Sequence, residues 1–554
     1  MKSKRFRKFL FVFAVVCSFI TLLAFNSPGD KYFEIAKNLD IFATLFKEVN
    51  TYYVDDVSPN KIMKKGIDAM LESLDPYTNY IPEDEVEDFR TMTTGQYGGI
   101  GAVIGKRNDR PIILMPYEGF PAHKAGLMVG DEIMAIDGTE VTSKNTSDIS
   151  KLLKGQSNTE VKLVIKRYGV DKPFDVKLTR EKIKIENVPY YGMVNSNTGY
   201  IKLTDFTSGA AREIKKAVLE LKDQGAKNVI LDLRDNPGGL LSEAVNIANI
   251  FVPKGSEIVS TKGKIAEWNK TYKALDGAVD ENIPLAVLTS SRSASASEIV
   301  AGVMQDYDRG VIVGERTFGK GLVQTTRPLS YNAQLKVTTA KYYTPSGRCI
   351  QAIDYTHRNE DGSVGTIPDS LRMAFKTTHG RQVFDGAGVS PDIPVEEKTL
   401  APITASLMGK GYLFDYASLY ASKHKTIKPA KEFRLSDAEY DDFLKWLDGK
   451  DYDYTTKVES TLDDLVKYSK KEQYYESIKT QIDGLKHQIN HNKENDLKTF
   501  KKEIVEQLDE EIVSRYYLQK GMIEASFDDD KDIVAAVKIF NDKSAFNEIL
   551  ARGK

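Results

Sequence analysis

The chain has 554 residues, of which 41% are hydrophobic and 28% charged, and its formal net charge is −2. A chain of this length exceeds one domain, and about three or four domains are expected. The near-neutral balance gives no electrostatic footprint for nucleic acid, and two cysteines are too few for a disulfide framework or a zinc–thiolate site.

The first segment carries an export signal. Five basic residues within residues 2–8 precede an uncharged, mostly apolar run at residues 9–25, which is typical of a signal peptide. No clear small-x-small cleavage site follows, so a retained membrane anchor stays open, although the run is short for a bilayer span of about 20 residues. Cys17 follows valine rather than a small residue, which argues against a lipoprotein. Residues 1–29 are therefore assigned to a signal peptide or anchor.

The next segment, residues 30–92, is predicted to be helical. Its apolar side chains recur at helical spacing, namely Ile35, Leu39, Phe42, Leu45, Phe46 and Val49. Such a stripe packs against something, either the chain's own core or a second copy of the chain in a homodimer.

Short strands alternate with two small helices in residues 93–186. Strands are expected at residues 102–106, 111–115, 131–136, 161–166 and 174–178, and helices at 121–127 and 147–153. The run GFPAHKAGLMVGDEIMAIDGTEV at residues 119–141 resembles a PDZ domain. In PDZ domains a glycine-containing loop binds a peptide's C-terminal carboxylate and the peptide adds as a strand. The resemblance implies that this peptide-binding loop consists of Tyr97, Gly98, Gly99, Ile100 and Gly101. A glycine-rich hairpin without a ligand is the alternative.

Strands alternate with helices in residues 187–398, which predicts a sheet covered by helices. A buried strand at residues 228–233 ends in RDNPGG, and another at residues 285–288 runs into a cluster of serines. Residues 399–554 are rich in Lys, Glu, Asp and Tyr and are interpreted as a helical C-terminal region, with long helical stretches such as residues 475–517 and a charged, solvated face. No chemistry is indicated there.

The serine cluster offers a candidate nucleophile. Five serines compete, namely Ser290, Ser291, Ser293, Ser295 and Ser297. The pattern Ser295-x-x-Glu298 is a capping box, which places Ser295 at a helix N-terminus where backbone N–H groups can hold an oxyanion. A plain helix cap is the alternative for this serine.

A lysine is the candidate base. The six histidines are His123, His357, His379, His424, His487 and His491. None lies in the two loop–helix units, whereas a Ser-His-Asp triad would need one. Lys320 lies between Gly319 and Gly321, and a desolvated lysine can act as a neutral base. Gln324, four residues later, could hydrogen-bond the amine and orient it.

Four motifs together resemble the C-terminal processing peptidases, also called tail-specific proteases. They are SLDPYTNYI at residues 73–81, ILDLRDNPGG at 230–239, SASASEIVAGVMQDY at 293–307 and VIVGERTFGKGLVQT at 311–325. The match runs over about residues 35–395. It implies a multidomain α/β and α+β fold, in which a helical segment and a PDZ domain (93–186) precede a β/α protease core of the crotonase and ClpP type (187–398).

The resemblance also implies roles for single residues. Ser295 would be the nucleophile, Lys320 the general base and Gln324 the support of the lysine. The oxyanion hole would use the N–H of Ala296 and one N–H from the turn of Gly238 and Gly239, with either glycine open. The segment TTHGRQVFDGAGVSP at residues 377–391 resembles a loop of bacterial members that shapes the cleft, and a pair of surface turns is its alternative.

The function implied is that of an exported, periplasmic serine endopeptidase that cuts polypeptides near their C-termini, with the PDZ domain holding the substrate's tail. Residues 9–25 would either be removed or anchor the enzyme in the inner membrane. No metal or cofactor is implied. One rival is a peptide-binding scaffold whose protease core is idle, and a weaker one is an acyl-CoA enzyme on a related crotonase fold.

Overall fold

A computed structural model describes residues 28–396 and 399–551 of the chain and divides them into two compact units, one up to residue 80 and one from residue 81 onward. The predicted signal or anchor lies outside the described residues. Within the two described ranges, no helix is both long enough and apolar enough to cross a bilayer.

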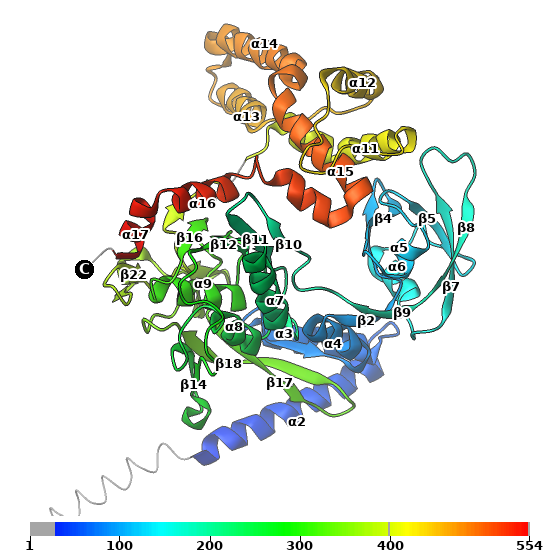
Figure 1. Cartoon of the computed structure of the whole chain (residues 1–554). Coiled ribbons are helices and arrows are strands. Elements are labelled where there is room, and N and C mark those ends of the chain that lie inside the picture. The colour runs from blue at the N-terminus through cyan, green and yellow to red at the C-terminus, as the bar shows by residue number, and fades with distance from the viewer. Residues whose placement is uncertain (1–27, 397–398, 552–554) are drawn as a thin grey trace, which may run out of the picture. The chain divides into compact units, whose positions relative to one another are not determined.

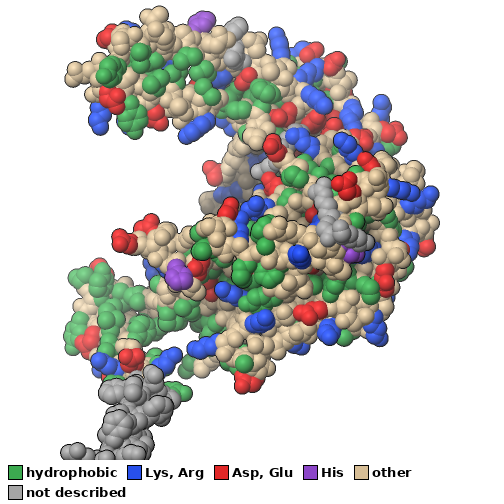
Figure 2. Space-filling model, turned by 90° about the vertical axis from the view of Figure 1, so that its left-hand side faces the viewer, with side chains coloured by type: hydrophobic (Ala, Val, Ile, Leu, Met, Phe, Trp, Pro, Cys, Tyr) green, Lys and Arg blue, Asp and Glu red, His purple; other side chains and the backbone are tan. Residues whose placement is uncertain are grey.

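The first unit contains two helices, α2 (Pro28–Tyr52) and α3 (Pro59–Glu72). Helix α3 begins with Pro59, whose fixed φ suits a first helical position. The predicted apolar stripe lies on α2, but its side chains are largely exposed, with Leu39 at 65% and Leu45 at 57%. Figure 2 shows hydrophobic side chains gathered on the surface at the lower left of the view. The stripe is therefore not part of the described core.

The PDZ region of the second unit is built on one antiparallel sheet in the order β3-β4-β5-β7-β8, with β6 beside β5. The strands are β3 (Ala102–Arg107), β4 (Arg110–Pro116), β5 (Glu132–Ile136), β6 (Thr139–Glu140), β7 (Glu160–Lys166) and β8 (Phe174–Thr179). Helices α5 (Pro121–Lys124) and α6 (Thr146–Leu153) accompany the sheet. Strand β7 alternates buried Val161, Leu163 and Ile165 with exposed or half-buried residues, because successive side chains face opposite sides of a sheet.

Before and after this sheet the chain forms a two-stranded ribbon of β2 (Gln96–Gly99) and β9 (Glu181–Lys184). Helix α4 (Val86–Thr94) precedes the ribbon and ends at Gly95, whose φ of 66° is the left-handed conformation that glycine adopts readily.

The protease core is built on a six-stranded sheet in the order β10-β11-β12-β15-β16-β23 (Figure 1). These strands are β10 (Tyr190–Met193), β11 (Thr198–Lys202), β12 (Asn228–Asp232), β15 (Leu285–Thr289), β16 (Val311–Gly314) and β23 (Ile393–Pro394). All neighbours are parallel except β10 and β11. The carboxyl ends of the parallel strands therefore meet at one edge, where binding and catalytic sites of open α/β sheets lie.

Helices cover both faces of this sheet. One face packs on α7 (Ala210–Asp223), α8 (Leu241–Ala248) and α9 (Ala296–Asp306) in a single apolar cluster. The other face packs on α16 (Lys531–Asn541) and α17 (Lys543–Ala551). The sequence interpretation gave these last two helices to the charged C-terminal region with a solvated face. Ile533, Ala536 and Phe540 are instead buried against the sheet.

A second sheet of the core is antiparallel and contains β13 (Glu257–Gly263), β14 (Lys270–Lys273), β17 (Leu322–Pro328) and β18 (Gln334–Tyr343). Two small hairpins follow, β19 (Ile353–Arg358) with β20 (Val364–Thr366), and β21 (Ala374–Lys376) with β22 (Gln382–Phe384). Strand β17 directly follows Gly321, so the second sheet carries the chain away from the Lys320 turn.

The C-terminal region is helical, as predicted, and has its own apolar cluster. Its helices are α10 (Pro402–Gly409), α11 (Tyr412–Lys423), α12 (Asp437–Leu447), α13 (Lys457–Lys471), α14 (Tyr475–Thr499) and α15 (Lys501–Ser526). The helical stretch expected at residues 475–517 is broken at Phe500, which ends α14 and precedes α15. Leu518 interrupts α15 with a φ of 54°.

Candidate active site

Ser295 lies where β15 ends and α9 begins, in the strand–turn–helix arrangement predicted. Its backbone angles are φ 56° and ψ −111°, and it precedes Ala296, the first residue of the helix. A non-glycine residue with these angles is strained by about 1–3 kcal/mol, and such strain concentrates at functional sites. A sharp turn of this kind exposes a nucleophile at the start of a helix. A plain cap does not require this conformation.

The neighbouring serines have structural partners. Ser293 and Ser297 are fully buried, and their hydroxyls donate to the carbonyls of Leu233 and Asn236 at 2.8 and 2.9 Å. Ser290 donates to the Asp235 carboxylate at 3.0 Å. These contacts join the serine cluster to the turn that follows β12. Ser295 is half-buried and occupies the N-cap position of α9.

Glu298 ties the Ser295 turn to the Lys320 turn. This buried carboxylate accepts four hydrogen bonds, from Ser295 N–H, Thr317 Oγ1, Gly319 N–H and Lys320 N–H, at 2.6–2.8 Å. The amides of Ser295 and Lys320 both donate to Oε2 at 2.8 Å. The two nitrogens therefore lie no further apart than twice that distance. Burial raises the pKa of Glu298, and the four donors act against that rise.

Lys320 is half-buried between Gly319 and Gly321, just before β17. Gly319 has a φ of 87°, and a Cβ there would come within 2.4 Å of Ala352 Cβ, so the turn needs glycine. Gln324 lies in β17 at an irregularity of the pairing with β18. Its side-chain amide donates to Thr338 Oγ1 at 3.1 Å. The structure thus places Lys320 at the Ser295 turn and Gln324 two residues into the strand that follows.

The segment at residues 377–391 contacts the turn that carries Lys320. Thr317 N–H donates to the Val389 carbonyl at 3.0 Å, and Val389 N–H donates to Thr317 Oγ1 at 2.7 Å. A Cβ at Gly388 would meet Thr317 O at 2.6 Å and Gly319 N at 3.1 Å. This end of the segment therefore packs on the backbone of the turn.

The glycine turn after β12 lies against Ser295. A Cβ at Gly238 would lie 2.9 Å from Ser295 Cβ and 2.8 Å from Ala296 N. The N–H of Gly238 donates to Asn236 Oδ1 at 2.9 Å. Within residues 28–396 and 399–551, the N–H groups of Gly239 and Ala296 make no protein hydrogen bond. Of the two glycines, Gly239 is thus the one whose amide is available to an oxyanion.

The predicted peptide-binding loop is shorter than expected. Tyr97, Gly98 and Gly99 lie in β2, paired with β9, and only Ile100 and Gly101 remain between β2 and β3. Burial raises the pKa of Tyr97, whose ring packs beneath the Lys154 ammonium. A Cβ at Gly98 would come within 2.1 Å of the Gly155 carbonyl oxygen. These three residues therefore build the ribbon, because pairing with β9 overrides the loop preference of glycine.

Two elements that the sequence analysis did not name as binding elements flank Ile100 and Gly101. Strand β3 is an edge strand of the PDZ sheet, and α6 lies beside it. The carbonyls of Ile100 and Gly101 accept bonds from Ala122 and Tyr117 at 2.8 and 2.9 Å, whereas their N–H groups have no partner among the described residues. An extended peptide can pair with such an edge and place its carboxylate at these amides. The strand expected at residues 102–106, directly after Gly101, was the feature of the sequence that could have indicated this binding edge.

The sequence analysis also treated Glu298 only as a cap partner and did not single out Asn236 or Thr317. Their role depends on contacts between distant turns, for which one sequence carries no direct signal. Across residues 28–396 and 399–551, no group of three or more His, Cys, Asp or Glu side chains is arranged to hold a metal ion.

Three family models match the chain. They are "Peptidase family S41" at residues 197–360, "PDZ domain" at residues 112–167 and "Probable PDZ-protease, C-terminal helical domain" at residues 403–540. The first covers β11 through β19, including both turns that Glu298 joins.

Curated relatives are also similar to the chain. A carboxy-terminal-processing protease of Bartonella bacilliformis is 38% identical over 335 residues, which are 60% of this chain and 76% of that protein. A probable CtpA-like serine protease of Staphylococcus aureus is 36% identical over 357 residues, covering 63% of this chain and 71% of that protein.

Two solved structures are also similar. A photosystem II D1 C-terminal processing protease is 29% identical, covers 67% of this chain and 95% of its own, and has a TM-score of 0.35. The PDZ domain of a carboxy-terminal protease from Vibrio cholerae, solved with a peptide, is 32% identical and covers 16% of this chain and 99% of its own, with a TM-score of 0.16.

Proposed function

Since the chain belongs to peptidase family S41 and is a serine-type protease of the C-terminal processing group, we propose that it cuts polypeptides near their C-termini with Ser295 as nucleophile and Lys320 as its base. The observation that carries this proposal is the Glu298 carboxylate, which holds the Ser295 and Lys320 backbones on one oxygen atom. A nucleophile and its base must be held together in this way for the reaction to proceed.

The reaction follows from this arrangement. Ser295 Oγ attacks the scissile carbonyl while the neutral Lys320 amine accepts the hydroxyl proton. The N–H groups of Ala296 and Gly239 bind the oxyanion of the tetrahedral intermediate. Lys320 then donates its proton to the departing amine, leaving an acyl-enzyme on Ser295. Water attacks the ester by the same route, with Lys320 again as base. Gln324 serves this step by orienting the amine.

The PDZ region would select the substrate. The free carboxylate of a tail binds at the amides of Ile100 and Gly101, and the tail pairs with the open edge of β3. The matches to a PDZ domain support this recognition of polypeptide C-termini. An amidated tail removes the carboxylate and should raise KM without changing kcat.

Export and assembly complete the proposal. The basic and apolar residues at the N-terminus support an exported enzyme of the periplasm, either released or anchored by residues 9–25. The exposed apolar side chains along α2 support a homodimer through this helix. Sedimentation of the chain with Leu39→Ser and Leu45→Ser tests the dimer, because these changes should yield monomers.

Activity is tested with a tailed model protein and mass spectrometry of its C-termini. Ser295→Ala and Lys320→Met should each lower the cleavage rate by at least about 1,000-fold, since they remove the nucleophile or the base. Ser291→Ala changes an exposed serine of the same cluster and should keep the wild-type rate. Wild-type cleavage by the Ser295→Ala protein would refute Ser295 as the nucleophile, whereas absence of cleavage by the wild-type protein would favour the idle-core scaffold.

A further inference from the structure

Arg234 stands at the start of the turn that carries Gly238 and Gly239, directly after β12. On its inner side, the guanidinium donates to the buried Asp232 carboxylate through Nε at 3.0 Å and Nη2 at 2.6 Å. Lys202 Nζ lies 3.2 Å from the same carboxylate. Burial alone would raise the pKa of Asp232, but Arg234 and Lys202 outweigh it and hold the pKa below its usual range.

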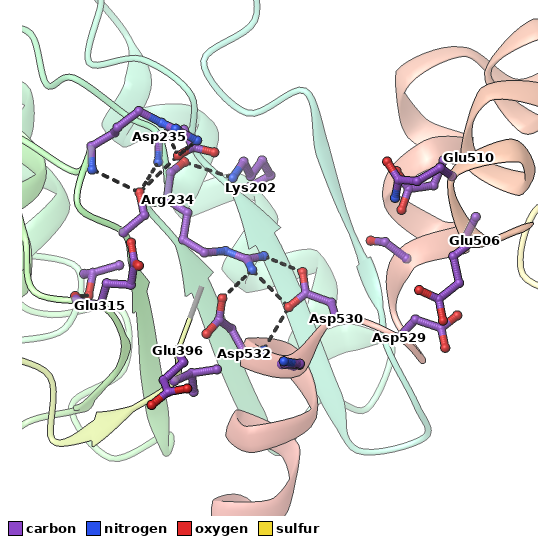
Figure 3. A pocket seen from close by; sticks show the side chains of 18 of the residues that line it. Lys202, Arg234, Asp235, Glu315, Glu396, Glu506, Glu510, Asp529, Asp530 and Asp532 are labelled. Atoms are coloured by element: carbon purple, nitrogen blue, oxygen red, sulfur yellow. Dashed lines mark hydrogen bonds and ion pairs between the residues drawn. The ribbon is translucent and has the colours of Figure 1, made fainter. Parts of the chain in front are cut away.

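On its outer side, Arg234 is held by two carboxylates from the other end of the chain. Nη1 donates to Asp530 Oδ1 at 2.9 Å and to Asp532 Oδ2 at 2.7 Å, and Nη2 lies 2.8 Å from Asp530 Oδ2. Figure 3 shows Asp530 and Asp532 converging on the guanidinium from the start of α16. The side chains of all three residues are 17–18% exposed, so this cluster is far less screened than a surface ion pair.

The two aspartates are fixed by the helix that bears them. Asp530 is the N-cap of α16, and its carboxylate accepts the N–H groups of Asp532 and Ile533 at 3.0 and 3.1 Å. Helix α16 in turn packs on the central sheet through Ile533, Ala536 and Phe540. The carboxylates are therefore anchored in the apolar core and provide a rigid support for Arg234.

The turn that starts at Arg234 reaches Ser295 within a few residues. Lys202 Nζ donates to the Arg234 carbonyl at 3.1 Å. Two residues later, the Asn236 carbonyl accepts Ala294 N–H at 3.0 Å and Ser297 Oγ at 2.9 Å, on either side of Ser295. A displacement of Arg234 would thus be transmitted directly to the backbone beside the nucleophile.

We propose that Asp530 and Asp532 are positioning residues for catalysis, which hold Arg234 and thereby set the Gly239 amide against Ser295. This inference rests on the proposed function of Ser295 and Gly239. It assigns the end of the C-terminal helical region a part in the chemistry of the protease core. The network contains one arginine between three carboxylates, and removal of the two outer charges leaves Asp232 as the only carboxylate of the network that pairs with Arg234.

The test compares the full-length double variant, which carries both Asp530→Asn and Asp532→Asn, with the wild type. Asparagine is also a good N-cap, so the first change removes charge and leaves the cap of α16. Asp529→Asn is the matched control, because Asp529 is exposed on the same segment and makes no ion pair with Arg234 among the described residues. Cleavage of a tailed peptide gives kcat and KM, and the fraction of folded protein is measured by circular dichroism.

We expect kcat per folded molecule to fall at least about tenfold in the double variant. Complete loss of an oxyanion donor costs about a hundredfold or more, and a displaced donor should cost part of that. KM should stay within about twofold, since the tail binds elsewhere. The control should match the wild type. A wild-type kcat overturns the inference, and so does a loss that only follows the fraction of unfolded protein or that Asp529→Asn reproduces. Failure of the proposed function is distinct, because Ser295→Ala would then cleave normally.

Discussion

The role of Glu298 leads to a quantitative prediction for Glu298→Gln. The amide replaces one acceptor oxygen by an NH2 group. It can keep its oxygen toward Ser295 and Lys320, which places the NH2 against Gly319 N–H and Thr317 Oγ1. The Thr317 hydroxyl can turn and accept, whereas Gly319 N–H loses its partner. One buried N–H without an acceptor costs about 1–3 kcal/mol of stability, and the Gly319–Lys320 peptide must shift.

A shift of about 1 Å at a reacting group lowers the rate by roughly 100-fold. We therefore expect kcat of Glu298→Gln to fall by up to that factor, with the free energy of unfolding in urea lowered by about 1–3 kcal/mol. Glu298→Ala removes the acceptor of three backbone amides and should be more severe in both measurements.

The control is Glu213→Gln. Glu213 Oε2 also accepts two backbone amides, from Asn187 and Val188 at 2.8 and 3.1 Å, but these lie at the connection between the PDZ region and β10. This change should cost comparable stability and leave kcat unchanged. The reasoning is refuted if Glu298→Gln retains the wild-type kcat, or if kcat falls by the same factor in Glu213→Gln. In either case the Glu298 carboxylate does not position the Ser295 and Lys320 turns for catalysis.

Three further predictions concern other parts of the chain. Gly238→Ala should lower kcat/KM by about 100-fold or more, because the added Cβ would press on Ser295. The control is Gly255→Ala, since Gly255 has a φ of 89° and open space around it. An equal loss of kcat/KM in both variants would contradict the expectation. Arg180 donates to the carbonyls of Leu152 and Leu153 at the end of α6 at 2.9 and 3.0 Å. Because α6 lies beside β3, where the tail is proposed to bind, Arg180→Met should raise KM for a tailed peptide about tenfold at constant kcat. An unchanged KM would contradict this expectation. Burial raises the pKa of Asp509 to about 6, so the neutral carboxyl is favoured in the folded state and its stabilising contribution is lost as pH rises through that value. Asp509→Asn should therefore raise Tm at pH 7 and leave it unchanged at pH 4. Equal shifts of Tm at both pH values would show that the charge is not the cause.

Local pattern was enough to predict most elements of the second unit. The strand at residues 285–288, the turn and the helix after it follow from an apolar run, small residues and a capping pair, all within one stretch of chain. Ser295 could be singled out from that stretch because its position relative to Glu298 marks the start of α9. The alternation in β7 likewise identifies its buried face without any knowledge of its neighbours.

Contacts between distant stretches could not be predicted in the same way. Glu298 meets Thr317 and Lys320 because β16 lies parallel to β15, and this pairing is set by the whole sheet. The glycines of β2 favour a loop by themselves, yet they pair with β9 at the far end of the PDZ region. Arg234 and Asp530 are separated by 296 positions, so no local pattern relates them.

The placement of α16 and α17 on the central sheet also sets an order of events during synthesis. The sheet face lined by Tyr200, Ile230 and Leu288 stays open to water until residues 527–546 have emerged to cover it. At about 5–20 residues per second, roughly 15–60 s pass between the synthesis of Arg234 and that of Asp530. The nascent chain thus exposes this apolar face for that interval, and exposed surface of this kind is prone to aggregation.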